Sequence, residues 1–128
     1  MTLLARNTPN DVYRRVELEA RIGGSDPRQL VTLCYEQLIG ALGSALHAAE
    51  RGDNNKKSEA LTRALSSVTS LQLGVSGSDD IAGALRHLYE ATRKAVLDSV
   101  ITFDARAIAT MRQDYVDILR AMHGEATH

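Results

Sequence analysis

The placement of proline constrains the fold of this chain more than any other feature of its sequence. Only two prolines occur, Pro9 and Pro27, and both lie in the first quarter of the chain. Proline lacks a backbone donor and clashes with the preceding helical turn, so it interrupts helices. Nothing after Pro27 therefore prevents long helices, and apolar residues that recur three and four positions apart predict them.

The first helix has clear start and stop signals. Asp26 is a candidate N-cap, Pro27 fits the first helical position, and Gln29 can complete a capping box. We expect this helix to reach Arg51, because Gly52 can adopt the left-handed conformation that ends helices.

Three further helices are predicted after a short turn at residues 53–55. The second helix stops at Gly74, and the third begins at Ser78 or a neighbouring aspartate. The fourth restarts near Asp104 and ends at His123, before a glycine. Their expected apolar stripes are Leu61, Ala64, Leu65, Val68 and Leu71 in the second helix, Ile81, Leu85, Leu88, Thr92, Val96, Ser99 and Phe103 in the third, and Ile108, Met111, Tyr115, Leu119 and Met122 in the fourth.

The short connections predict the topology. Neighbouring helices joined by short loops run antiparallel, so we expect an all-α, up-down-up-down four-helix bundle over residues 25–124. Residues 1–24 form a separate N-terminal arm in this interpretation, hinged at Gly23-Gly24, and residues 125–128 form a disordered tail. One leucine on the main stripe of each helix is expected in the core, and these are Leu38, Leu65, Leu85 and Leu119.

Composition argues against several functions. The net charge is −1, tryptophan is absent and phenylalanine occurs once, so the chain has neither the positive field nor the stacking platforms that nucleic acids require. The single cysteine, Cys34, excludes an internal disulfide framework and a multi-thiolate metal site. No apolar run approaches the roughly 20 residues of a membrane span. We expect a protein that holds no cofactor and no metal.

The histidines offer no catalytic arrangement. No two of them have the spacing of metal ligands within one helix, and a Glu-x-x-His spacing occurs only in the tail, at Glu125 and His128. A histidine phosphotransfer domain shares this size and fold, but it needs a basic residue one turn from an exposed histidine. His47 has no Lys or Arg at position 50, and Arg86 is adjacent to His87 rather than one turn away, so this alternative is disfavoured and no catalytic residue is assigned.

The sequence instead has a surplus of apolar and small surface. The first helix carries two adjacent apolar stripes, wider together than the face an edge helix buries. A central helix that touches several others explains this, and so does a surface kept for a partner. The candidate partner-binding residues at the margins of the stripes are Ile39, Leu42, Val68, Leu71, Met111 and Tyr115.

These candidates have an alternative interpretation as plain core residues. Met111 and Tyr115 suit a half-exposed groove, because methionine is adaptable and tyrosine has a polar tip. Gly40 and Gly43 lie on the opposite face of the first helix, where each glycine costs about 1 kcal/mol relative to alanine. Close approach of another backbone would offset that cost, and neutral drift is the alternative.

Several short motifs follow one another along the chain. Tyr13, with Glu17 after it, comes first. The later motifs are Ser25-Asp26-Pro27-Arg28-Gln29-Leu30-Val31-Thr32-Leu33-Cys34-Tyr35-Glu36, then Ala49-Glu50-Arg51-Gly52-Asp53, then Ile81-Ala82-Gly83-Ala84-Leu85-Arg86-His87-Leu88-Tyr89. In order and spacing, over about residues 13–122, they resemble the FliS family of flagellin-specific export chaperones, and Tyr13 resembles the family's N-terminal tyrosine.

The resemblance implies a binding protein rather than an enzyme. Family members hold the disordered C-terminal segment of flagellin in the cytoplasm, which prevents premature polymerisation, and escort it to the type III export gate. The arm would cover part of the binding surface, with Tyr13 as its anchor, until flagellin displaces it. Other flagellar regulators and weak self-association are further partners that the resemblance allows. The alternative is a helical-bundle adaptor for another secreted or regulatory partner.

Overall fold

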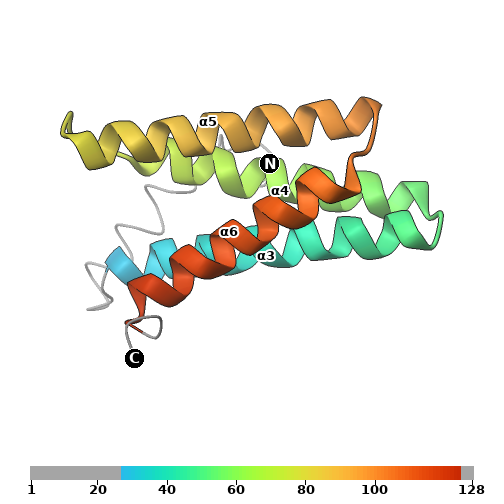
Figure 1. Ribbon diagram of the computed structural model, residues 1–128, viewed down its shortest axis with the longest axis horizontal. Helices are drawn as coiled ribbons and strands as arrows, with labels where there is room; N and C mark the ends of the chain where they lie inside the picture. The colour runs from blue at the N-terminus through green and yellow to red at the C-terminus, as the bar shows by residue number, and fades with distance from the viewer. Residues whose placement is uncertain (1–26, 125–128) are drawn as a thin grey trace, which may run out of the picture.

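Four α-helices make up most of the part of the chain that the computed structural model describes, residues 27–124. They are α3 (Pro27–Glu50), α4 (Asn54–Gly74), α5 (Asp80–Ile101) and α6 (Ala105–Met122), with no strand in this range. The predicted all-α four-helix fold is confirmed. Consecutive helices run back and forth along the long axis of the molecule (Figure 1). The expected arm, the tail and the Asp26 cap lie outside the described residues.

Aspartate side chains begin the last three helices. Asp53, Asp79 and Asp104 each accept a hydrogen bond from the backbone N–H three residues later, at 3.1, 2.8 and 3.0 Å. Each cap satisfies a donor that the first helical turn leaves unpaired. Because Asp53 is a cap, α4 begins at Asn54, and the expected turn over residues 53–55 is wrong. Gly52 takes the predicted left-handed conformation, with φ of 69°.

Alanines bring α3 and α4 together as the closest pair of helices. Small side chains let two helix axes approach, and the separation of packed helices depends on the residues at the contact. Helix α5 packs on α4 and α6 packs on α3, whereas the backbones of α5 and α6 come close to each other at few positions. The α5–α6 side is therefore the more loosely packed side of the bundle. The buried alanines of the central pair are Ala41, Ala45, Ala48, Ala60 and Ala64.

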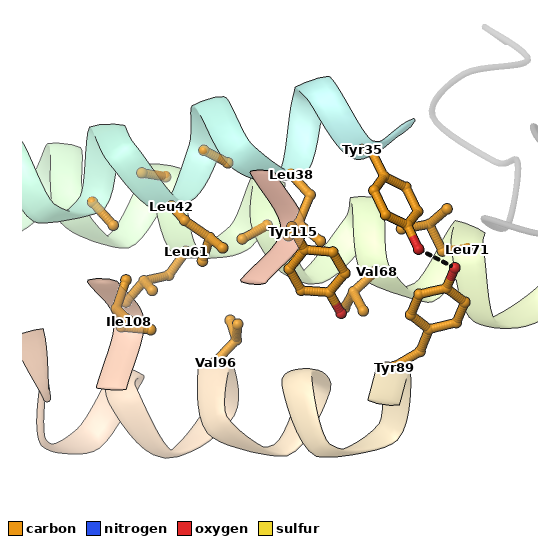
Figure 2. Close-up of a cluster of buried hydrophobic side chains, with 14 residues drawn as sticks. Tyr35, Leu38, Leu42, Leu61, Val68, Leu71, Tyr89, Val96, Ile108 and Tyr115 are labelled. Atoms are coloured by element: carbon orange, nitrogen blue, oxygen red, sulfur yellow. Dashed lines mark hydrogen bonds between the residues drawn. The ribbon is translucent and has the colours of Figure 1, made fainter. Parts of the chain in front are cut away.

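The core lies between the central pair and the two outer helices. Figure 2 shows Leu38 and Leu42 of α3 in one buried layer with Leu61 and Val68 of α4, with Val96 and Ile108 of the outer helices on its other side. Of the four leucines expected in the core, Leu38 is fully buried, as predicted. The other three, Leu65, Leu85 and Leu119, pack against the core but remain half-buried.

The inward face of α5 differs from the predicted stripe in its first half. Ile81 is 72% exposed, while Tyr89, which the prediction left out, is 3% exposed. Thr92, Val96 and Ser99 are buried as expected. The face is turned toward Tyr89 because that ring buries more area than Ile81 and meets Tyr35 of α3. Periodicity within one helix cannot report such a contact.

Candidate functional site

Three tyrosines from different helices meet in the core. The ring of Tyr35 in α3 lies edge-on to Tyr89 and Tyr115, with centroids 6.3 and 5.3 Å apart. Edge-to-face rings attract through their quadrupoles in addition to the area they bury. The hydroxyl oxygens of Tyr35 and Tyr89 are hydrogen-bonded at 2.7 Å (Figure 2). The cluster ties α3 to both outer helices, whose backbones come close to each other at few positions.

A second buried hydroxyl pair joins α5 to α6. Thr92 Oγ1 donates to the carbonyl of Leu88 at 2.8 Å, so the hydroxyl of Tyr115 donates to Thr92 Oγ1 at 2.6 Å. Both residues are almost completely buried. Burial is the main cause that raises the pKa of Tyr115 to about 12, and the hydrogen bond to Thr92 opposes it. The hydroxyl therefore stays protonated near neutral pH.

Replacing Thr92 with valine should lower the free energy of unfolding by about 1–3 kcal/mol, because it leaves the buried Tyr115 hydroxyl without its acceptor. Urea denaturation measures the change. Tyr115→Phe removes the same contact, while Thr92 keeps its bond to Leu88, so the double variant T92V/Y115F should lose less than the sum of the two single variants. Strict additivity in this double-mutant cycle would contradict the assigned bond.

Three apolar clefts indent the surface of the bundle. The end cleft, about 290 Å³, lies where the first turns of α3 and α5 meet the loop after α4, and Val31, Leu71 and Tyr89 are in its wall. The α5–α6 cleft, about 380 Å³, is lined by Leu88 and Met111 among others. The α3–α6 cleft is lined by Ile39, Val116, Leu119, Glu36, Gly40, Arg120 and His123, and its volume is about 410 Å³.

The predicted partner-binding residues do not form one groove. Ile39 is half-buried in the α3–α6 cleft, Met111 is half-buried in the α5–α6 cleft, and Leu71 lies in the wall of the end cleft. Tyr13 lies outside the described residues. The apolar candidates are therefore distributed over three separate clefts around the bundle.

Three of the candidates are deeper than the sequence suggested. Leu42, Val68 and Tyr115 are completely buried, so the expectation that Tyr115 is half-exposed is wrong. The reason is the hydroxyl of Thr92, which gives the polar tip of Tyr115 a buried partner and removes its need for water. Tyr115 still contributes to the wall of the α5–α6 cleft, beneath Met111.

The two α3 glycines have different surroundings. A Cβ at Gly43 would lie 3.1 Å from Nε of Arg112, which donates a hydrogen bond to the carbonyl of Ile39 at 3.2 Å. A side chain of α6, rather than a backbone, thus makes the close approach at Gly43. Nothing lies within 4 Å of the corresponding position at Gly40.

A further groove runs along α3 and α4 and shares Gly40 with the α3–α6 cleft. Side chains of both charges line that groove, among them Arg51, Arg63 and Glu59, so it is a poor binding site for an apolar segment. His47 and His87 are exposed. The guanidinium of Arg86, next to His87, donates to the carbonyl of Gly77 at 2.5 Å. No group of metal-ligating side chains occurs within residues 27–124.

Apolar side chains also stand exposed outside the clefts. Leu97, Val100 and Ile101 crowd the last turn of α5, and Ile101 is 89% exposed. Exposed apolar groups of this kind, clustered on one helix, are typical of surfaces that bind partners. No helix in the described range is both long enough and apolar enough to cross a bilayer.

One comparison with known proteins identifies a family. The family model described as flagellar protein FliS matches residues 9–127, nearly the whole chain. No curated protein matches the chain.

Proposed function

The chain belongs to the FliS family, a family of flagellar export chaperones, and we propose that it binds the C-terminal segment of flagellin in the cytoplasm and keeps it from polymerising before export. The coarser function, flagellar export chaperone with flagellin as its partner, follows from the family. The choice of segment, the delivery to the export gate and the cytoplasmic location are parts of the proposal.

The opening between α5 and α6 is the observation that carries the proposal. A four-helix bundle that closed on all sides would have its apolar residues covered by its own helices. Here the backbones of the outer helices come close to each other at few positions, and Leu88 and Met111 remain half-buried in the cleft between them. A disordered apolar segment that folds as it binds can cover such clefts, because it presents side chains at helical spacing.

The candidate residues take different roles in this proposal. Met111, Ile39 and Leu71 contact the bound segment, each from its own cleft, so the segment runs over more than one side of the bundle. Tyr115 supports Met111 from below, and Leu42 and Val68 hold the helices in place. Tyr13 competes with the segment as the anchor of the arm.

Met111→Ala should weaken binding of a flagellin C-terminal peptide by about 1–3 kcal/mol, or roughly 5- to 150-fold, because it removes an anchor from the α5–α6 cleft. Isothermal titration calorimetry measures the affinity. The melting temperature should barely move, because Met111 is only half-buried. Tyr13→Ala should tighten binding, since it removes the competing ligand.

The control is Leu33→Ala. Leu33 is exposed and apolar, lies on α3, and does not take part in any of the three clefts. It should leave the affinity within about twofold of the wild type, as expected for surface substitutions away from a binding site. Unchanged affinity in Met111→Ala would move the binding site away from the α5–α6 cleft, and no binding by the wild type would refute the proposed client.

A further inference from the structure

One of the two hydroxyl protons of the Tyr35–Tyr89 pair has no acceptor within the pair. Tyr35 and Tyr89 are 1% and 3% exposed, and their hydroxyl oxygens are 2.7 Å apart. Each hydroxyl carries one proton, and only one of the two protons can lie in the bond between them. Within residues 27–124, neither hydroxyl has another hydrogen-bond partner. One buried donor is therefore left without an acceptor, which native proteins usually avoid.

The pair is located beside the end cleft. Tyr89 and Leu71 both belong to the wall of this cleft, and Figure 2 shows Leu71 next to the two hydroxyls. The cleft is wide enough for water, whose oxygen can accept a hydrogen bond from the unpaired hydroxyl in the free protein. If an apolar group displaces that water without offering an acceptor, the hydroxyl loses its hydrogen bond and affinity falls.

The charge of the lining restricts the kind of acceptor. Among the residues of the wall that lie within the described range, Asp79 is acidic and none is basic. A carboxylate on the bound segment would therefore meet a like charge, whereas a neutral carbonyl would not. The remaining side chains of the wall are mostly apolar, with Val31, Val75 and Ile81 among them. The cleft thus suits an apolar side chain accompanied by one neutral acceptor.

We propose that Tyr89 is a specificity-determining donor of the end cleft, which takes an apolar chain segment that presents a carbonyl oxygen. In the complex, Tyr35 donates to Tyr89 and Tyr89 donates to that carbonyl, so both protons are used. The inference rests on the proposed function in one respect, that the segment belongs to the client. Burial is the main cause that raises the pKa of Tyr89, so this donor keeps its proton under physiological conditions.

Two matched variants separate this role from a structural one. Tyr35→Phe and Tyr89→Phe each remove one hydroxyl and break the same internal hydrogen bond, so both should lose similar stability. Only Tyr89→Phe removes the donor that faces the ligand. It should weaken binding about 3- to 10-fold, the effect of one neutral hydrogen bond, while Tyr35→Phe stays within about twofold of the wild type.

The probe is N-acetyl-leucine methylamide, which carries one apolar side chain and neutral carbonyl acceptors. Its binding to the full chain is followed by NMR at the methyl groups of Leu71, Ile81 and Leu85, which line the end cleft. Equal losses in the two tyrosine variants, no loss in Tyr89→Phe, or no shift at these methyl groups in the wild type would overturn the proposal.

A second variant, at the rim of the end cleft, tests the proposal even if Tyr89→Phe does not fold. Ile81 is largely exposed, so Ile81→Ser should leave the fold intact and weaken binding of the probe about 3-fold or more. Unchanged binding in Ile81→Ser would also overturn the proposal. The flagellin C-terminal peptide is titrated separately and tests the proposed client. If this peptide does not bind, the result with the small probe still stands.

Discussion

Replacing Leu38 with alanine should lower the free energy of unfolding by about 2–5 kcal/mol. Leu38 is completely buried at the centre of α3, where it packs in the core that the other three helices also enter. The substitution removes the transfer energy of the lost methyl groups and leaves a cavity. The surrounding helices cannot fill that cavity without moving, because the close α3–α4 pair is fixed by its alanines.

Leu33→Ala is the matched control for this loss. It makes the same chemical change in the same helix, but Leu33 is 47% exposed. Its effect should stay below about 1 kcal/mol, since surface substitutions rarely cost more. Urea denaturation of both variants, followed by circular dichroism, gives the comparison. Similar losses in the two variants would contradict the assigned inward face of α3.

Much of the fold follows from local signals in the sequence. The absence of proline after Pro27 predicts long helices, and the positions of Gly52, Gly74 and Asp104 predict where they end and restart. These signals work because helix termini have unpaired backbone groups that only a few residue types satisfy. Asp53 was misassigned to a turn because an aspartate before a helix serves equally well in either role.

The tertiary contacts could not be predicted in the same way. Tyr35 meets Tyr89 across 54 positions of sequence and Thr92 meets Tyr115 across 23. The Tyr35–Tyr89 pair turns the first half of the inward face of α5 away from the predicted stripe, and the periodicity of one helix contains no information about either pair. Leu85 is half-buried because it lines the end cleft, which α3, α4 and α5 form together.

The candidate site was predicted only in part for the same physical reason. Three of the residues predicted from the edges of the apolar stripes line clefts in the structure, and these are Ile39, Leu71 and Met111. A residue at the edge of an apolar stripe is exposed only if the neighbouring helix does not cover it. Met111 is only half-buried, whereas Leu42 is completely buried. Tyr89 was missed because its hydroxyl matters only beside Tyr35, a contact between two helices.

The protein should lose stability steeply as the pH rises above about 10. Burial is the main cause that raises the pKa of Tyr115 to about 12 and raises the pKa values of Tyr35 and Tyr89. The unfolded chain releases these protons near pH 10, whereas the folded state keeps them. Folding is thus favoured fully below pH 10 and progressively less above it. Tyr115 alone should account for a loss on the order of 2 kcal/mol by pH 12.

Two signals measured together test this alkaline transition. Ultraviolet absorbance of the phenolates reports ionisation, circular dichroism reports helix content, and the two should change together because the buried tyrosines ionise only on unfolding. Tyr115→Phe removes one of the titrating groups, so the free energy of unfolding should fall less steeply with pH in this variant than in the wild type. If all the tyrosines ionised near pH 10 while the helices persisted, their hydroxyls would have to be accessible to water in the folded protein. That result would contradict the buried tyrosine cluster.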